Sequence, residues 1–166
     1  MIVQKKQIKT LLILLIALII SNFYPTNQNK SENNIYVSRV IDGDTIELST
    51  GQKLRYIGVD TPELNFNKNP ECFAKESTEF NKKLVENKKV ELEKDISDKD
   101  KYGRLLRNVY VQNESSSSAI FVNEYLVQQG FATVSTYPPD IAHIEELLIA
   151  QQEARENNRG LWGKCN

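Results

Sequence analysis

The chain has 166 residues, a length typical of one domain, and this excludes a large multidomain assembly. It carries 21 lysines and arginines against 22 acidic residues, so its net charge of -1 provides no overall positive field for binding nucleic acid non-specifically. Charged residues at 26% and hydrophobic residues at 40% are ordinary values for a folded domain and exclude a disordered or fibrous chain.

The N-terminal segment predicts export. Lys5, Lys6 and Lys9, with no acidic residue, precede an unbroken apolar run over residues 11–20. Such a run rises about 15 Å as a helix, about half the hydrocarbon core of a membrane, and this favours a signal peptide over residues 1–20. Because an A-x-A cleavage pattern is missing, an uncleaved membrane anchor is the alternative. Removal of residues 1–20 leaves 18 basic and 22 acidic residues, a net charge near -4.

Residues 21–34 are polar and predict a flexible leader, and the folded domain is expected over residues 35–166. From residue 35, apolar and polar residues alternate up to about residue 60, with turn signals at Asp42-Gly43 and Thr50-Gly51. This pattern predicts three consecutive antiparallel strands.

The rest of the chain predicts two more strands and three helices. A helical pattern follows Pro70 and stops near Asn87, and strands are expected over residues 88–94 and 105–112. A short helix is expected over residues 121–129, and Pro138 and Pro139 are expected to open a last helix that runs to about Asn157. Five strands with three appended helices predict a mainly β, α+β fold, a small five-stranded Greek-key barrel of the OB type.

The two cysteines, Cys72 and Cys165, permit one disulfide in an exported chain. Such a bond would tie the C-terminal tail to the segment that precedes the first helix. The alternative is two unrelated thiols.

Acidic residues cluster where predicted strands end. Asp44 follows a turn and Asp60 ends a strand, so the two carboxylates can share a hard divalent cation, and Ca²⁺ suits such a loose set of oxygen ligands. The competing EF-hand loop is excluded, because it requires Gly and Glu where this chain has Glu47 and Lys53. The plainer alternative is turn chemistry at Asp42-Gly43-Asp44 and at Asp60-Thr61-Pro62.

Two arginines add a second element. Arg55 lies in the middle of an apolar-rich strand, where a guanidinium is buried only if carboxylates or a phosphate meet it. Arg104 follows a turn at Tyr102-Gly103 and can present a second fork of donors to a phosphodiester. Each alone is compatible with a structural ion pair. Together with a cation site and Glu63 as a base for water, they fit metal-assisted phosphodiester hydrolysis.

Residues 35–164 resemble the thermonuclease, or staphylococcal nuclease, family. Five blocks carry the resemblance in order, and NRGLWG closes the chain: VIDGDTIEL, LRYIGVDTPE, FAKESTEFNKKLVEN, DKYGRLL and FVNEYLVQQGFATV. The resemblance implies an OB-fold barrel with three helices and a calcium-dependent nuclease. It also implies action on DNA and RNA, with a preference for single-stranded or unwound substrate, and 3′-phosphate products.

The resemblance also assigns roles by position. Asp44 and Asp60 match calcium carboxylates, and Thr61 matches a main-chain carbonyl ligand. Asp42 matches a carboxylate near the cation, behind its direct ligands. The catalytic matches are Glu63 as general base, Arg55 and Arg104 as phosphate-binding arginines, and Arg104 as an aid to the leaving 5′ oxygen.

Lys101 and Tyr102 match residues that line the nucleotide pocket, and Tyr137 is the one tyrosine retained where a relative has two. We therefore expect an exported, monomeric nuclease of low sequence specificity, which contacts a membrane only if residues 1–20 are not cleaved. The alternatives are a non-catalytic OB module that binds single strands or a protein partner, and an anchored cell-surface structural protein.

Overall fold

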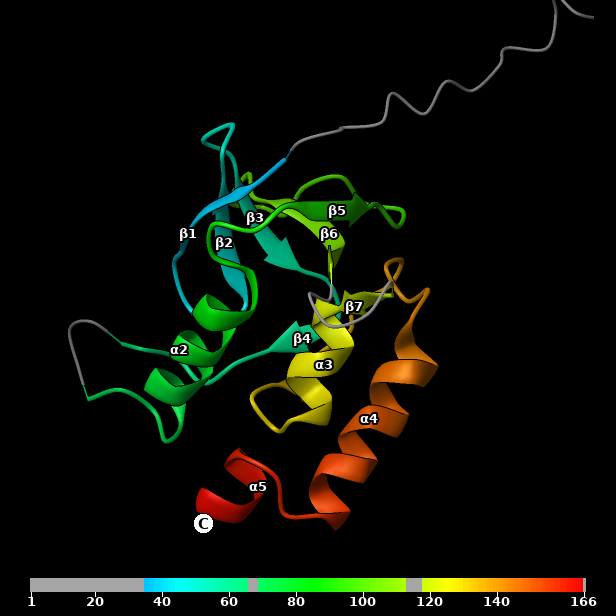
Figure 1. The fold of residues 1–166 in the computed structure, drawn as a ribbon. Coiled ribbons are helices and arrows are strands. Elements are labelled where there is room, and N and C mark those ends of the chain that lie inside the picture. The colour runs from blue at the N-terminus through cyan, green and yellow to red at the C-terminus, as the bar shows by residue number, and fades with distance from the viewer. Residues whose placement is uncertain (1–34, 66–68, 113–117, 166) are drawn as a thin grey trace, which may run out of the picture. The chain divides into compact units, whose positions relative to one another are not determined.

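The computed structural model describes residues 35–65, 69–112 and 118–165 (Figure 1). The predicted export segment and leader lie outside these residues. Three strands open the fold: β1 (Val37–Val40), β2 (Thr45–Leu48) and β3 (Lys53–Tyr56). They pair antiparallel in chain order, which confirms the predicted meander. Their alternating side chains bury Val37, Ile46 and Leu54 completely, as expected for a sheet with one face on the core.

The main sheet continues through β6 (Leu105–Gln112) and β5 (Val90–Glu93), and β7 (Ala119–Phe121) pairs with β6. The described sheet therefore has six strands rather than five, because β7 is too short to show a period-two pattern in the sequence. β3 and β6 are parallel, with Arg55 opposite Leu106. This pairing brings Arg55 near the start of β6. Arg104 is the residue directly before that start.

The two ends of the sheet path approach each other at one point. Tyr36 and Lys89 form an isolated antiparallel bridge. The Val37 amide donates to the Lys88 carbonyl at 3.0 Å, and the Asn87 amide donates to the Val37 carbonyl at 2.9 Å. No strand ladder closes the sheet among the described residues, so the observed architecture is an α+β fold with a mixed sheet.

A small second sheet positions one edge of the site. β4 (Val59–Asp60) pairs antiparallel with β8 (Thr133–Val134), and Asp60 lies opposite Thr133. The Thr133 hydroxyl also donates to the Asp60 carbonyl at 3.3 Å. Two-residue strands carry no readable periodicity, so the sequence did not predict this pair.

In the described part of the chain, four helices accompany the sheets: α2 (Ala74–Val85), α3 (Val122–Gln128), α4 (Ile144–Glu156) and the one-turn α5 (Leu161–Lys164). The first three match expectation in place, and α5 was not predicted. The expected start of the last helix at the prolines was wrong. The peptide bond between Pro138 and Pro139 is cis, the Tyr137 carbonyl accepts from the Asp140 amide in a turn, and α4 starts at Ile144.

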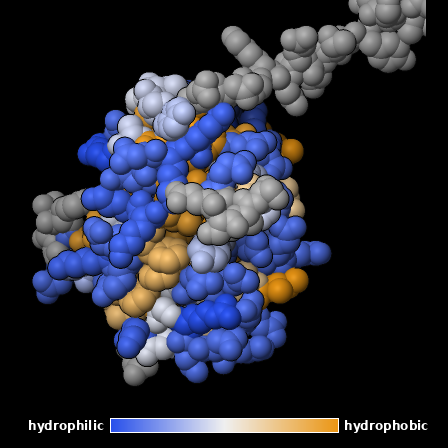
Figure 2. All heavy atoms as spheres, viewed as in Figure 1, coloured by the Kyte–Doolittle hydropathy of each residue, from blue (hydrophilic) through white to orange (hydrophobic). Residues whose placement is uncertain are grey.

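The core joins buried side chains of β1 to β6 with side chains of α2, α3 and α4. Tyr56 is fully buried there, and its hydroxyl donates to Asn81 of α2 at 2.9 Å. The face with α2 in view is largely hydrophilic, with a strip of hydrophobic side chains (Figure 2). Phe80 stacks on Phe131, with 3.9 Å between their ring centroids. Among residues 35–65, 69–112 and 118–165, no helix has the length and apolar character needed to cross a membrane.

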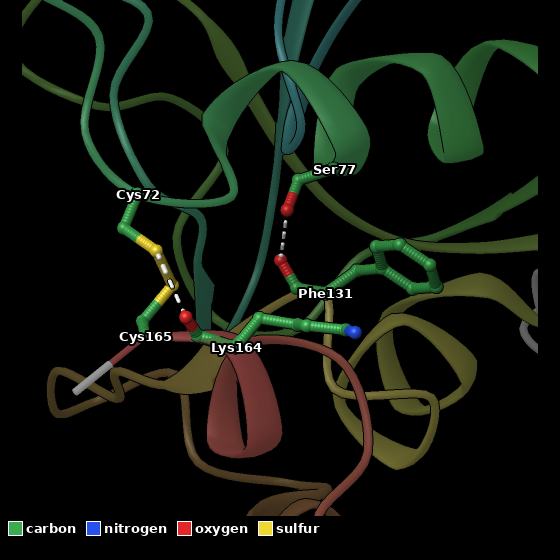
Figure 3. The surroundings of a disulfide bond; sticks show 5 residues. All are labelled: Cys72, Ser77, Phe131, Lys164 and Cys165. Carbon is green, nitrogen blue, oxygen red and sulfur yellow. Dashed lines mark hydrogen bonds between the residues drawn. A yellow bond between two sulfur atoms is a disulfide. The ribbon is translucent and has the colours of Figure 1, made fainter.

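The C-terminal end is fixed by close backbone contacts and a disulfide. Cys72 and Cys165 are bonded, with 5.8 Å between their Cα atoms (Figure 3). The Leu161 amide donates to the Gly130 carbonyl at 2.9 Å. A Cβ on Gly130 would lie 2.3 Å from the Arg159 carbonyl oxygen, so glycine is required for this approach.

Candidate active site

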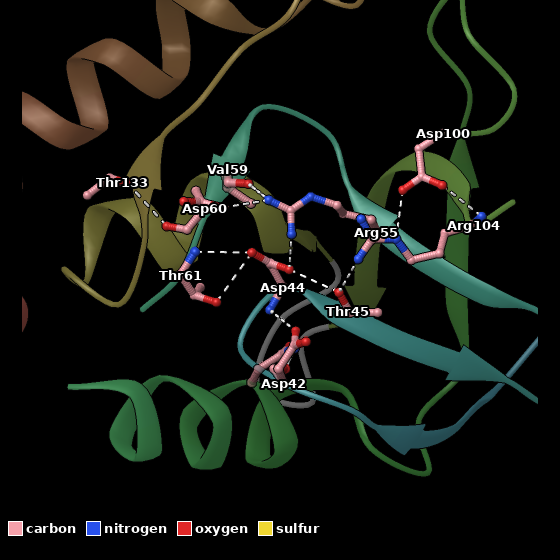
Figure 4. A network of polar contacts seen from close by, with 11 residues as sticks. Asp42, Asp44, Thr45, Arg55, Val59, Asp60, Thr61, Asp100, Arg104 and Thr133 are labelled. Atoms are coloured by element: carbon pink, nitrogen blue, oxygen red, sulfur yellow. Dashed lines mark hydrogen bonds and ion pairs between the residues drawn. The ribbon is translucent and has the colours of Figure 1, made fainter. Parts of the chain in front are cut away.

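The predicted acidic and basic residues gather at one place. Asp42 and Asp44 lie in the turn between β1 and β2, Arg55 lies in β3, and Asp60 ends β4. Arg104 lies just before β6, which is the parallel neighbour of β3. Figure 4 shows the resulting network, with Thr61 and Asp60 on one side of Asp44 and Arg104 on the other.

Arg55 connects the two carboxylates. Its Nη1 donates to Asp44 Oδ1 at 2.5 Å, and its Nη2 donates to Asp60 Oδ1 at 2.6 Å. The Arg55 side chain is 21% exposed, that of Asp44 3% and that of Asp60 50%. The guanidinium is therefore part-buried and met by carboxylates, as its place in an apolar strand predicts. The Arg55 guanidinium therefore forms ion pairs with both Asp44 and Asp60.

Asp44 is buried and hydrogen-bonded on both oxygens. Its Oδ2 accepts from the Thr61 amide at 3.0 Å and from the Thr61 hydroxyl at 3.3 Å. Its Oδ1 also accepts from the Thr45 hydroxyl at 3.0 Å. Burial raises the pKa of Asp44 to about 6, an effect opposed by Arg55 and reinforced by the Asp42 carboxylate. A cation bound next to Asp44 would therefore stabilise the ionised form of its carboxylate.

Asp42 stabilises the turn that carries Asp44. Its Oδ1 accepts from the Asp44 amide at 3.1 Å, which is an Asx-type turn. Its carbonyl accepts from the Asn81 side chain at 3.2 Å. Asp42 therefore contacts the backbone of Asp44 and lies behind its carboxylate.

Glu63 follows Thr61 and Pro62 at the edge of the network. Its amide donates to Glu71 Oε2 at 2.9 Å, so its backbone is fixed while its side chain is exposed. Partial burial and then the carboxylates of Asp42 and Asp60 raise the pKa of Glu63. Repulsion by those two acids indicates that Glu63 faces the same electrostatic environment as the proposed cation ligands.

Arg104 is held in place by Asp100. Its Nε donates to Asp100 Oδ2 at 2.7 Å, and its Nη1 donates to the Thr45 hydroxyl at 3.3 Å. Because Thr45 also binds Asp44, one hydroxyl links the two arginine clusters. The guanidinium carbon lies 5.4 Å from the centroid of the Tyr102 ring, and the Lys101 Nζ lies 5.0 Å from the same centroid.

Tyr102 is 72% exposed and Tyr137 is 75% exposed. Lys101, Tyr102 and Arg104 form one cluster. Within the described part of the chain, no hydrogen bond, ion pair or ring contact connects Tyr137 to that cluster; Tyr137 instead forms an isolated bridge with Asp140. The structure thus brings together all of the predicted site residues except Tyr137.

The sequence analysis missed several residues that contact the site, among them Thr45, Glu71 and Asp100. Asp100 had a readable signal, since its Oδ1 accepts from the amides of Tyr102 and Arg104 in the turn before Gly103. Thr45 and Glu71 had none, because their partners lie in other elements.

The donor set fits a calcium ion, with Asp44, Asp60 and the Thr61 carbonyl as the candidate ligands. Asp44 and Asp60 contact the Arg55 guanidinium, and the carboxylates of Asp42 and Glu63 interact electrostatically with the same group. The excess negative charge and the all-oxygen donors are what Ca²⁺ prefers. No group of three or more His, Cys, Asp or Glu side chains suited to a metal occurs among the described residues.

Comparison with known proteins identifies the family of this chain. The chain matches the family described as Staphylococcal nuclease homologue over residues 53–164. It is 38% identical to the thermonuclease of Staphylococcus hyicus over 138 residues, which cover 81% of this chain and 78% of that protein. It is 34% identical to the thermonuclease of Staphylococcus intermedius over 171 aligned positions, which cover 95% of this chain and 98% of that protein.

A third relative is endonuclease YncB of Bacillus subtilis (strain 168), which is 38% identical over 144 residues. The alignment covers 83% of this chain and 65% of that protein. An α+β fold with an acid and arginine cluster beside its sheet defines the class, that of thermonuclease-like phosphodiester hydrolases. The chain belongs to the staphylococcal nuclease family.

Proposed function

We propose that this protein is a calcium-dependent nuclease that hydrolyses DNA and RNA with low sequence specificity and leaves 3′-phosphate ends. The observation that carries the proposal is the bridge formed by Arg55 between Asp44 and Asp60, with Arg104 connected to it through Thr45. A purely structural ion pair needs one acid and one base. Two carboxylates around one arginine, with a second arginine beside them, are suited to binding a metal cation and the phosphates of a polyanionic substrate.

The arginines act on the phosphate. Acids hold both guanidinium groups in place, Asp44 and Asp60 for Arg55 and Asp100 for Arg104, and the remaining planar N–H donors of each can bind phosphate oxygens. Donors that are already oriented stabilise the charge of the pentacoordinate transition state without reorganisation. Arg104 is assigned to the side of the leaving 5′ oxygen.

Glu63 acts on the nucleophile. Its carboxylate accepts the proton of the attacking water, or orients that water, while its backbone is fixed by Glu71. A bond forms between the water oxygen and phosphorus, and the bond from phosphorus to the 5′ oxygen breaks. The products are a 3′-phosphate and a 5′-hydroxyl.

Calcium would be held by Asp44, Asp60 and the Thr61 carbonyl, and it would supply charge neutralisation and polarisation of the phosphoryl group. Asp42 keeps Asp44 in place through the Asp44 amide. Thr61 donates twice to Asp44, so the cation ligands are connected to one another before any ion binds.

Substrate preference follows from exposed groups. Tyr102 offers an open ring beside Lys101 and Arg104, and stacking on such a ring is worth about 1 to 3 kcal/mol per base. Stacking requires an unpaired base, so single-stranded or unwound substrate is preferred. Tyr137 is proposed as a second, separate contact.

The site works in an exported, monomeric protein. The support is the N-terminal sequence pattern of residues 1–20 and the disulfide between Cys72 and Cys165, a bond typical of oxidising compartments. For residues 35–166 we propose an OB-type barrel, in which the contact between residues 35–37 and 87–90 represents the seam.

One assay tests the enzyme. Purified protein lacking residues 1–34 is incubated with denatured DNA plus calcium, and in parallel with excess chelator. We expect cleavage with calcium only, and end-labelling that detects 3′-phosphates. Binding of the DNA without cleavage would favour the non-catalytic OB module instead.

A further inference from the structure

The disulfide lies beside the segment that carries Glu63. Cys72 directly follows Glu71, and its Sγ also contacts the Lys164 carbonyl at 3.8 Å (Figure 3). Cys72 is exposed, and Cys165 is partly exposed, so solvent reaches the bond. The disulfide joins positions that are 93 residues apart in the sequence. Near Cys72, it is the only covalent cross-link among the described residues.

Glu71 and Glu63 bind each other reciprocally. The Glu63 amide donates to the Glu71 carboxylate at 2.9 Å, and the Glu71 amide donates to the Glu63 carbonyl at 3.0 Å. Two such bonds fix the backbone of Glu63 relative to Glu71, the neighbour of Cys72. Any displacement of residues 71–72 is therefore transmitted to the backbone of Glu63.

The other half of the disulfide is on a fixed support. The Leu161 amide donates to the Gly130 carbonyl at 2.9 Å, and the Leu161 side chain is buried. Arg159 donates to the Gln128 carbonyl at 3.0 Å and to Glu153 at 2.7 Å. The Arg155 guanidinium lies 4.3 Å from the Trp162 ring centroid. Cys165 is thus connected to α3 and α4 through several independent contacts.

A cavity of about 320 Å³ separates the disulfide from the proposed cation ligands. It is lined by Asp60, Thr61, Pro62, Glu71, Thr133, Leu161 and both cysteines. Because this space is open, close packing does not hold residues 71–72 on the side of Asp60. The disulfide is the covalent link across this space.

We propose that the Cys72–Cys165 disulfide is a positioning element for Glu63, acting through Glu71, so that full turnover requires the oxidised protein. The inference rests on the proposed function, in which Glu63 acts on the attacking water. Reduction by a dithiol transfers two electrons and two protons to the disulfide, which becomes two thiols while the dithiol becomes a cyclic disulfide. The nuclease is then weakly active in a reducing compartment and fully active after export.

The first test compares turnover and substrate binding before and after reduction. Oxidised protein, protein reduced with dithiothreitol, and the double variant Cys72→Ser with Cys165→Ser are assayed on denatured DNA with calcium. Circular dichroism fixes a temperature at which all three are folded. We expect kcat to fall about 10- to 100-fold with KM within about threefold, because a general base displaced by about 1 Å loses that much rate. An unchanged kcat in the folded, reduced protein overturns the proposal.

A second test separates positioning from general loosening. In the Glu63→Gln background, reduction should change kcat by less than about threefold, since the disulfide acts through the missing carboxylate. If reduction instead lowers kcat by the same factor in both backgrounds, the disulfide does not act through Glu63.

A third test leaves the disulfide intact. Glu71→Ala removes the acceptor for the Glu63 amide and should lower kcat about tenfold or more. Glu71→Gln keeps an oxygen acceptor and should restore kcat to within about threefold of the parent. Equal kcat in the alanine variant and the parent refutes the link. An oxidised parent protein without any cleavage would refute the proposed function rather than this inference.

Discussion

The substitution Arg104→Lys tests whether Arg104 binds the phosphate through its forked donors or only forms a structural ion pair. Arg104 is held by Asp100 through Nε, with side chains 24% and 15% exposed, and its Nη1 reaches the Thr45 hydroxyl. Lysine keeps the charge and loses the fork of donors. Loss of one donor to a developing transition-state charge costs about 10²- to 10³-fold in rate, so we expect kcat to fall about 10²-fold with KM within about threefold.

The matched control is Arg107→Lys, in β6. Arg107 also forms a forked set of contacts, with Nη2 at 2.8 Å from Asp98 Oδ1 and Nη1 at 2.7 Å from the Leu106 carbonyl. Both substitutions should lower the free energy of unfolding only slightly, because each removes contacts of a pair that solvent reaches. Only Arg104→Lys should impair cleavage.

The assay is steady-state cleavage of denatured DNA with calcium, together with urea unfolding of parent and variants. A kcat for Arg104→Lys within about threefold of the parent would refute phosphate binding through the forked donors. Equal loss of kcat in Arg107→Lys would show that the activity follows stability and not phosphate contact.

Three further predictions concern the cation site, its packing and export. Asp44→Asn should weaken calcium binding and reduce cleavage by orders of magnitude, whereas Asp98→Asn should have a mild effect on both. Isothermal titration calorimetry measures calcium binding and steady-state kinetics measures cleavage. A larger loss in Asp98→Asn than in Asp44→Asn would contradict the ligand assignment. Gly43→Ala should lower activity, because an added Cβ would lie 2.5 Å from the Thr61 hydroxyl oxygen and displace Thr61. If kcat and calcium affinity match those of the parent, the turn at residue 43 adjusts without displacing Thr61. N-terminal sequencing of the exported protein should begin after residue 20, and a chain that still starts at Met1 would favour the membrane anchor.

Part of the fold was readable from local pattern. The meander β1–β3 follows from period-two alternation between two glycine turns, and α2 follows from its helical spacing. The parallel pairing of β3 with β6 did not follow, because strands separated by about 50 residues carry no local signal of their partner. The two-residue strands β4 and β8 and the one-turn α5 are too short for any periodicity.

The site divides in the same way. The sequence by itself determined which residue types were present, and the apolar surroundings of Arg55 required either carboxylates or a phosphate to meet it, since a buried guanidinium must be paired. Only the tertiary structure decided that one guanidinium joins Asp44 to Asp60, that Thr45 connects Asp44 to Arg104, and that a disulfide between positions 93 residues apart lies next to Glu71, which binds the Glu63 amide. Hydrogen bonds between distant elements depend on how those elements pack, and packing is a property of the whole chain rather than of any segment in it.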